Sequence, residues 1–372
     1  MMISIFILTY VVLIFSLSFT PYVTRKTELF GINIPSSETD NPDAKKLRRL
    51  YRDITIFVGF IALAVQLILF FFTKISDQMQ INIFLIMIFV YLIASFLIYL
   101  FFHNKMKTLK ANLGWIDSDD STNDSQIVVD TTLIDEDILP AKWLLLYPLV
   151  AAITIICIII IWPFIPAQIP MQINFDGEVT RWAIKSFKTV ILMVSSQWLI
   201  FIIMTVIYYV IKNSKRQIDI AEPEDSRFQG HRFRRIMSAS MIIGGAVLGA
   251  IMGLMFILMF LNTASTLLSA MPFIIILLVV VFVVVLYARI GQGGSRIVTK
   301  SQESEALLNR DDDKFWKLGV FYFNKNDPSL FVEKRFGVGY TNNFAKPLSW
   351  LLFLGLIAII VVFAIVTIKL AS

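Results

Sequence analysis

Long apolar segments joined by polar connections make up most of the chain. A bilayer core about 30 Å thick needs roughly 20 apolar residues for each helical crossing. Because backbone groups in lipid must be paired within the segment, each such run predicts a helix. Eight segments reach or approach this length and contain no Asp, Glu, Lys, Arg or His: residues 2–20, 54–72, 81–102, 143–162, 190–211, 236–261, 271–287 and 348–368. Segment 271–287 is short, so its helix either starts earlier, near Leu267, or crosses a thinned bilayer.

The composition agrees with a membrane protein. Hydrophobic residues make up 57% of the 372 residues and charged residues 16%, and the mean hydropathy is +0.75. These values exclude an ordinary water-soluble enzyme. The single cysteine, Cys157, excludes an intrachain disulfide, and the two histidines, His103 and His231, are too few for a Cys/His zinc cluster. With no nucleophile placed beside a base, we predict a non-enzymatic protein without metal or other cofactors.

The distribution of Lys and Arg predicts the orientation in the membrane, because these residues resist translocation. Alternate connections carry 28 Lys and Arg on one side and 5 on the other. The richer side is expected in the cytoplasm and comprises residues 21–53, 103–142, 212–235 and 288–347. Both termini then face outward. The first segment has no basic n-region and is expected to remain as an anchor; a cleaved signal peptide is the alternative.

The net charge of +6 does not predict nucleic-acid binding. The cytoplasmic connections hold 24 acidic residues beside their 28 basic ones, without a concentrated basic face. We therefore expect no direct contact with nucleic acid. The basic residues instead favour the lipid bilayer as a partner, through its anionic headgroups.

The predicted fold is an all-α polytopic membrane protein with eight transmembrane helices, both termini outside, and a small cytoplasmic β-hairpin-like segment. Two short strands around a turn at 326–328 are expected within residues 315–343. Three parts are predicted: an N-terminal three-helix segment (1–135), a four-helix core (136–290), and an aromatic-rich small domain with the last helix (291–372).

Glycines recur every four residues in the sixth segment, at Gly245, Gly249 and Gly253. One face of this helix is nearly bare backbone, so another helix can approach it closely. Tight helix packing is the simpler interpretation, and a pore or sliding surface is the alternative. No charged residue lies within the eight segments, which disfavours an ion-coupled transporter. Transport of a neutral or amphiphilic solute stays open, with Gln197 among the few interior polar groups.

Two cytoplasmic stretches have local patterns of their own. Residues 36–53 place Leu47, Leu50 and Tyr51 on one face among cations, which predicts an amphipathic helix on the inner leaflet. Residues 291–294, Gly-Gln-Gly-Gly, favour a helix C-terminal cap with a flexible exit. A phosphate-binding loop is the alternative, but the strand-to-helix context of such loops is missing.

The connection 163–189 is the only substantial outer loop. Pro166 and Pro170 stiffen its approach, Asp176-Gly177 is a turn signal, and Trp182 suits the membrane interface. This loop is either a rigid cap over the neighbouring helices or a surface for a ligand that arrives from outside.

The spacing in this loop matches a known pattern, Pro-x3-Pro-x3-Asn-x2-Gly followed by Arg-Trp-x2-Lys. The matching residues are Pro166, Pro170, Asn174, Gly177, Arg181, Trp182 and Lys185. Over roughly residues 140–240 the chain resembles the SdpI-type bacterial immunity and signalling membrane proteins. That family often has a His two residues before the Asn, where this chain has Gln172, so a protonation or metal role is not expected to transfer.

A second resemblance covers residues 316–347, which are similar to a small uncharacterised domain often appended to such proteins. Together with the stretch 30–35, it indicates a longer subfamily. The family resemblance implies immunity to a secreted peptide or toxin, a cytoplasmic protein partner such as a repressor, and location in the bacterial cytoplasmic membrane. The candidate ligand-binding residues are Pro170, Asn174, Asp176, Gly177, Trp182 and Lys185. The alternative function is transport of a neutral or amphiphilic solute.

Overall fold

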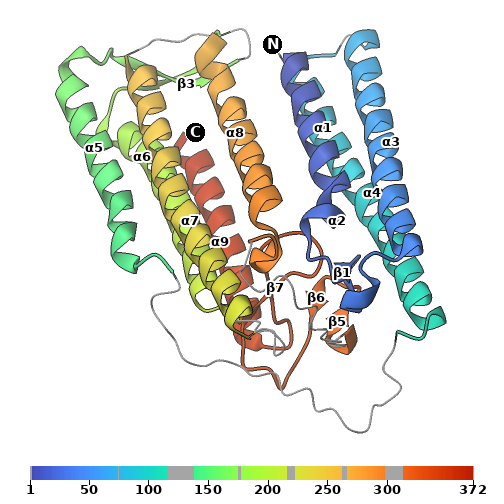
Figure 1. Ribbon diagram of the computed structural model, residues 1–372. Helices are drawn as coiled ribbons and strands as arrows, with labels where there is room; N and C mark the ends of the chain where they lie inside the picture. Colours follow the sequence, from blue (N-terminus) through green and yellow to red (C-terminus); the bar gives the residue numbers. More distant parts are fainter. Residues whose placement is uncertain are drawn as a thin grey trace.

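A computed structural model describes residues 2–73, 75–115, 138–174, 177–215, 223–261, 266–297 and 313–371. The fold is mostly helical with small β-hairpins, as Figure 1 shows. Its helices are α1 (Met2–Ser18), α2 (Thr20–Val23), α3 (Pro42–Phe72), α4 (Asp77–Asn112), α5 (Leu146–Ile161), α6 (Phe187–Lys212), α7 (Pro223–Phe260), α8 (Thr266–Ile290) and α9 (Pro347–Ala371). Its strands are β1 (Glu28–Leu29), β2 (Ile32–Asn33), β3 (Gln168–Ile173), β4 (Val179–Ile184), β5 (Trp316–Lys317), β6 (Phe321–Tyr322), β7 (Phe331–Glu333) and β8 (Tyr340–Asn342).

Among the described residues, six helices are long and apolar enough to cross a membrane. Their spans are Pro42–Phe72, Met79–Asn112, Ala141–Phe164, Phe187–Lys212, Arg227–Phe260 and Ala270–Gly294. The apolar helices Met2–Ser18 and Pro347–Phe363 are shorter than this length criterion. By length and composition, the chain is a multi-pass membrane protein.

Several helices extend beyond the apolar segments that predicted them. Asn41 caps the N-terminus of α3, where its side chain accepts hydrogen bonds from the backbone N–H of Asp43 at 3.0 Å and of Ala44 at 3.3 Å. The basic stretch that follows is therefore the first part of α3, and not a separate helix lying on the inner leaflet as predicted. An existing helix adds further turns more readily than a new one forms, so polar residues continue it. Helix α8 begins at Thr266, in agreement with the earlier start.

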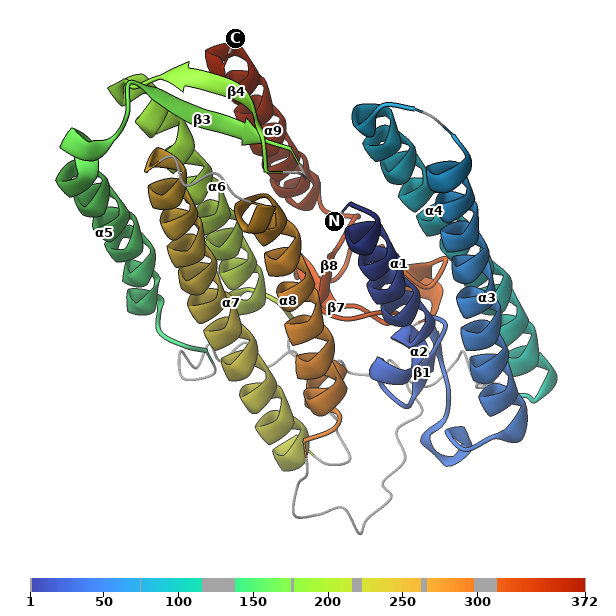
Figure 2. The same ribbon diagram turned by 90° about the horizontal axis from the view of Figure 1, so that it is seen from above.

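The helices form two groups that stand side by side (Figures 1 and 2). In the N-terminal group α3 packs against both α1 and α4. In the C-terminal group α7 packs against α5, α6 and α8, and α9 packs against α6. Contacts between α1 and α8 join the groups. Buried aromatic rings fill the N-terminal group, where Phe6 of α1 stacks on Phe84 of α4 with ring centroids 4.0 Å apart.

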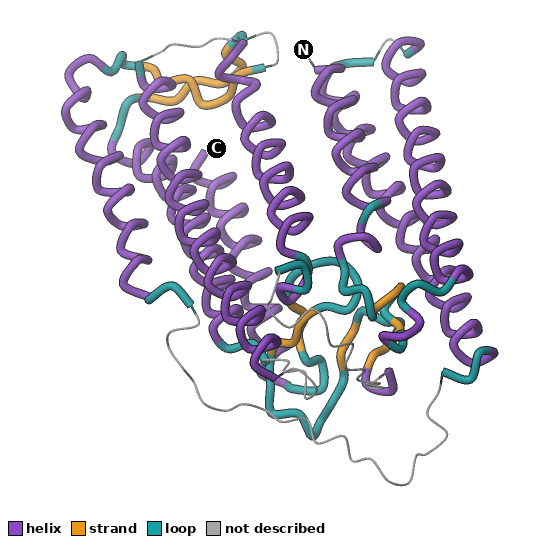
Figure 3. Tube along the Cα trace, viewed as in Figure 1, coloured by secondary structure: helices purple, strands orange, loops and turns teal. Residues whose placement is uncertain are grey.

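The hairpins gather at opposite ends of the helices. Hairpin β3–β4 lies at the same end as the N-terminus, while β1 and the strands β5–β8 lie at the other end (Figures 1 to 3). The chain thus places the connection 163–189 at one end and the small domain 313–346 at the other.

The small domain is richer in strands than predicted. Each of the two expected strands is a hairpin of its own, β5–β6 and β7–β8, and the turn at 326–328 joins the two hairpins. Leu318 and Gly319 reverse the chain after β5 with φ angles of +54° and +69°. Gly337 and Gly339, with φ angles of +85° and +99°, do so after β7. The alternation of residues along the sequence predicted strands, but it does not show such tight reversals, because these depend on the backbone angles of single residues.

Candidate functional site

The outer connection 163–189 folds into the antiparallel hairpin β3–β4. Gln168 pairs with Ile184, Ile169 with Ala183, and Pro170 with Trp182. The register shifts after Pro170, so the distal part of the hairpin is irregular. Facing residues share one side of a hairpin, so Trp182 and Ile184 lie on the opposite side from Ile169.

Asn174 and Gly177 close the hairpin loop. The Asn174 side-chain oxygen accepts from the Glu178 N–H at 2.8 Å, and its amide donates to the Glu178 carboxylate at 3.1 Å. Gly177 has a φ of +87° and donates its N–H to the Asn174 carbonyl oxygen at 3.1 Å. Only glycine adopts this angle without steric cost. These two residues build the loop, while the candidate Asp176 lies outside the described residues.

Lys185 anchors the hairpin to the end of α5. Its ammonium group donates to the carbonyl oxygens of Trp162 at 2.6 Å and Ile165 at 2.9 Å. The same ammonium lies 4.9 Å from the Trp162 ring centroid, and that ring stacks on Phe187 at 4.8 Å. A cation at a helix C-terminus satisfies carbonyls that have no partner within the helix. Lys185 therefore positions the hairpin, and its charge is already engaged.

The inner side of the hairpin is packed on the helices. Ile169 is fully buried and belongs to an apolar cluster with Ile165 and Phe260. Pro170 is also buried, although its pairing with Trp182 places it on the opposite side of the hairpin. This packing sets the hairpin across the end of α7.

The opposite side of the hairpin leaves large apolar side chains uncovered. Trp182 is 44% exposed and Ile184 is 77% exposed. Phe164 and Phe187, at the adjoining ends of the helices, are 76% and 73% exposed. Sequence reasoning found Trp182 but missed Ile184. The alternation of Thr180, Trp182 and Ile184 on a predicted strand would have indicated it.

The three glycines of α7 lie elsewhere, where α7 meets α5 and α6. A Cβ atom at Gly245 would lie 2.6 Å from the Tyr147 hydroxyl, and at Gly249 and Gly253 it would collide with Phe201 and Thr154. Gln197 of α6 donates to the Gly249 carbonyl oxygen at 2.7 Å and to the Thr154 hydroxyl at 3.2 Å. The glycines thus admit side chains of two neighbouring helices, and these side chains fill the space beside them.

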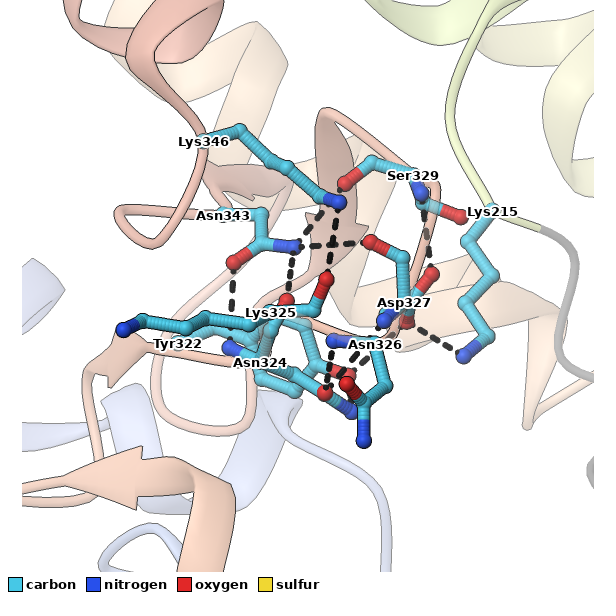
Figure 4. Close-up of polar contacts among 9 residues, drawn as sticks. All are labelled: Lys215, Tyr322, Asn324, Lys325, Asn326, Asp327, Ser329, Asn343 and Lys346. Carbon is cyan, nitrogen blue, oxygen red and sulfur yellow. Dashed lines mark hydrogen bonds and ion pairs between the residues drawn. The ribbon is translucent and has the colours of Figure 1, made fainter.

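A buried polar cluster holds the small domain to the end of α6 (Figure 4). Asp327 forms an ion pair with Lys215 at 2.6 Å and accepts a hydrogen bond from the Tyr322 hydroxyl at 2.8 Å. Burial opposes ionisation of Asp327, but the hydrogen bonds from Lys215, the Ser329 N–H and Tyr322 outweigh it. The pKa of Asp327 therefore lies below its usual value.

Asn343 links the two hairpins of the small domain. Its amide donates to the carbonyl oxygens of Asn324 at 2.8 Å and Ser329 at 3.1 Å, and its side-chain oxygen accepts from the Asn324 N–H at 3.1 Å. One buried side chain thus satisfies several backbone groups of the turn between the hairpins. Asn343 lies within the second resemblance, residues 316–347, but the sequence did not indicate this role.

The small domain also docks on the N-terminal helices. The Tyr99 hydroxyl donates to the Leu318 carbonyl oxygen at 2.8 Å, and the Lys110 ammonium lies 2.8 Å from the Asp313 carboxylate. The tips of two hairpins meet here, because a Cβ atom at Gly31 would lie 2.5 Å from the Gly319 carbonyl oxygen.

The loop 291–294 packs against the protein. The Gln292 amide donates to the Gly339 carbonyl oxygen at 2.8 Å, and its side-chain oxygen accepts from the Gly339 N–H at 2.9 Å. Arg25 and Glu333, which form an ion pair, fill the space beside Gly293. Gly291, with a φ of +71°, ends α8 as predicted for a C-terminal cap, and its N–H donates to the Tyr287 carbonyl oxygen at 2.8 Å. The loop that follows packs closely against the small domain, which differs from the flexible exit that was predicted.

These features define a multi-pass membrane protein with the hairpin β3–β4 at one end of its helices and a small β-domain at the other. Two segments of the chain match the sequence models of protein families. Residues 149–195 match a domain of unknown function (DUF1648) and residues 325–350 match a family of unknown function (DUF5808). The first match covers most of α5, the hairpin and the start of α6; the second covers β7, β8 and the start of α9. No curated protein and no solved structure matches the chain. Neither description names the SdpI-type family, so that resemblance stays a prediction.

Proposed function

We propose that the protein crosses the bacterial cytoplasmic membrane eight times, with the hairpin β3–β4 and both termini outside. The hairpin and the small domain lie at opposite ends of the helices, and the connections at the end of the small domain carry 28 of the 33 Lys and Arg. Helices α1 and α9 supply the two crossings beyond the six long spans. Helix α1 has 17 residues, so a slight thinning of the bilayer accommodates it.

Cysteine labelling tests this orientation. The chain has one cysteine, so Cys157→Ser gives a background without thiols. Gln168→Cys on the hairpin and Lys317→Cys on β5 are both at exposed positions. In intact cells an impermeant maleimide should label the first variant and spare the second, whereas permeabilised cells should label both. The reverse pattern would overturn the orientation and the function built on it.

The function proposed for the hairpin is non-enzymatic binding of a secreted peptide or toxin, as immunity or sensing. The exposed pair Trp182 and Ile184, held on a hairpin that Lys185 anchors, is the observation that supports it. Exposed aromatic and aliphatic side chains on a rigid scaffold are typical of peptide-binding surfaces. In this proposal Asn174, Gly177 and Lys185 shape the surface, and Trp182 contacts the peptide.

Survival of a sensitive host tests this function. Cells that express the protein are exposed to a panel of secreted peptides, and the Trp182→Ala variant is compared with Lys188→Gln, a control at an exposed position of the adjoining helix. Protection should be lost in the first variant and retained in the second, while both insert at equal levels. Equal protection by both variants would count against peptide binding at Trp182.

The small domain is proposed to dock a cytoplasmic protein partner such as a repressor. Phe321 and Phe323 of this domain are 40% and 39% exposed. Phe321→Ser should abolish co-purification of the partner without changing membrane insertion. Retention of the partner by this variant would refute docking at this surface.

The second candidate function is transport of a neutral or amphiphilic solute. Among the described residues, the Gln197 side-chain oxygen and both polar atoms of Gln66 are buried without a hydrogen-bond partner. Such atoms are unusual within helix bundles and are candidate contacts for a polar solute. However, Tyr147, Phe201 and Thr154 fill the space along the α7 glycines. Solute flux in vesicles that is lost in Gln197→Leu would favour transport over peptide binding.

A further inference from the structure

Three arginine side chains, from two parts of the chain, contact Tyr22, which lies in the short helix α2. The Arg48 guanidinium carbon of α3 is 5.8 Å from the Tyr22 ring centroid. Arg52, one turn further along α3, interacts electrostatically with the same phenol. Arg296, beyond the end of α8, donates a hydrogen bond to the Tyr22 carbonyl oxygen. The chain thus brings three guanidinium groups into contact with one residue, two at its side chain and one at its backbone.

This cluster has more positive than negative charge. Asp53 is bonded to Arg52 at 2.8 Å, and the other nearby carboxylate, Asp40, is bonded to Lys45 at 2.8 Å. Within the described residues no ion pair is formed by Arg48 or Arg296. Among the described residues, Asp53 is thus the one carboxylate in an ion pair with these arginines, and Asp40 adds an electrostatic attraction to Arg48.

The cluster also has hydrogen-bond donors to spare. The Arg48 Nε atom is covered by neighbouring atoms and has no hydrogen-bond partner among the described residues. The Tyr22 hydroxyl is covered as well, and its oxygen interacts with the Arg52 guanidinium group, which leaves its O–H free to donate. Arg296 donates to the carbonyl oxygens of Ala288 and Tyr22, and a guanidinium group has five N–H donors. Covered donors without an acceptor cost free energy, so an oxyanion with several acceptor oxygens suits this point.

An apolar surface leads from this cluster into the membrane segment of α1. Phe15 and Phe19 are 52% and 38% exposed. Their rings stack at 6.0 Å, and Phe19 lies 5.6 Å from the Tyr22 ring. Cations at the end of an apolar helix, next to exposed aromatic rings, match the two parts of a phospholipid better than a free anion.

We propose that Tyr22, Arg48, Arg52 and Arg296 bind the phosphate group of an anionic phospholipid, whose acyl chain lies along Phe15 and Phe19. In the lipid-bound protein the Arg48 side chain turns so that its covered Nε donates to the phosphate, and the Tyr22 hydroxyl donates beside it. The site is independent of the function proposed for the hairpin. It lies where α2, α3 and the exit from α8 meet, so a bound lipid would join the two helix groups.

The test uses the full-length protein in nanodiscs of phosphatidylcholine with or without phosphatidylglycerol. Native mass spectrometry counts retained phosphatidylglycerol, and thermal unfolding reports its stabilising effect. The double variant Arg48→Gln/Arg52→Gln is compared with Lys46→Gln/Arg49→Gln, which removes the same charge from exposed positions of the same helix. The first should retain phosphatidylglycerol about tenfold less than the wild type, and the second should resemble the wild type.

A milder variant covers the possibility that the double variant does not fold. Tyr22→Phe keeps the ring and the backbone contact to Arg296 and removes only the hydroxyl, so it should weaken retention by about threefold. Equal losses in the two double variants would overturn the site, since diffuse attraction would explain them. Equal stabilisation by inorganic phosphate, without phosphatidylglycerol, would overturn the assignment to a lipid.

Discussion

The Nζ atom of Lys215 lies 2.6 Å from the Oδ2 atom of Asp327, and the two side chains are only 4% and 2% exposed. The pair joins the residues after α6 to the turn between the two hairpins of the small domain. Breaking a buried ion pair by removing one partner leaves the other charge buried and unpaired. The small domain therefore depends on this contact for its attachment to the C-terminal helix group.

Asp327→Asn should destabilise this attachment by about 3 kcal/mol, because the Lys215 ammonium loses its counter-charge. Thermal unfolding of the purified protein measures the change. Asp40→Asn is the matched control, since Asp40 also pairs with a lysine at 2.8 Å but its side chain is 88% exposed. It should unfold like the wild type. Similar destabilisation by both variants would show that burial of the pair is unimportant.

The Lys215–Asp327 pair should also make stability depend on pH in the acid range. The pKa of Asp327 is lower in the folded protein than in the unfolded chain. The stabilisation that ionised Asp327 gives to the folded protein is therefore complete above the unfolded-state pKa, about 3.9. It is lost as the pH falls through the lower folded-state pKa. The gap in unfolding midpoint between wild type and Asp327→Asn should narrow below about pH 4. A gap that is constant down to pH 2 would contradict this.

Lys185→Met should loosen the hairpin β3–β4, because the carbonyl oxygens of Trp162 and Ile165, in the turn after α5, lose two charge-assisted hydrogen bonds, each worth about 1.5–3 kcal/mol. Hydrogen exchange of the β3 and β4 amides should accelerate at least tenfold, while that of α6 stays unchanged. Lys188→Met, at an exposed position nearby, is the control and should leave β3 and β4 protected. Unchanged protection in Lys185→Met would mean that packing of Ile169 alone holds the hairpin.

Gly249→Val should destabilise the C-terminal helix group by about 2 kcal/mol, because its side chain would collide with Phe201. Phe201 is buried and its ring stacks on Tyr147 at 4.7 Å, so it has little room to move. Gly244→Val on the same helix meets open space and serves as control. The unfolding midpoint in detergent measures both. A Gly249→Val protein as stable as Gly244→Val would show that the helices can separate without cost.

Gly31→Ala should weaken the contact between the small domain and the N-terminal helices. Its φ of +76° costs an alanine about 1 kcal/mol, and the new Cβ would also strike the Gly319 backbone. Gly114→Ala is the control, because it should incur only the cost of the backbone angle: Gly114 has a φ of +66° and open space around it. Proteolysis between the helix groups and the small domain should accelerate in Gly31→Ala. Equal rates in the two variants would place the whole effect in the backbone angle.

The candidate site shows where sequence reasoning reached its limit. The spacing of Asn174, Gly177, Trp182 and Lys185 indicated a structured outer loop, because turn formers and interfacial aromatics act locally. It did not show that Lys185 binds the turn that follows α5, since that depends on where this turn lies relative to the hairpin. It also missed Ile184, whose exposure follows from the register of β3 and β4.

The sequence by itself determined the long apolar helices, since hydrophobicity acts on each segment wherever its neighbours lie. From loop charge it also predicted which connections share a side of the membrane. Only the tertiary structure decided which side chains meet across the chain, such as Tyr99 with Leu318, 219 positions apart. It also decided that the basic stretch after Asn41 belongs to α3 and that the 291–294 loop packs on Gly339. Such contacts depend on how the helices are placed in three dimensions, and no local pattern of residues encodes that placement.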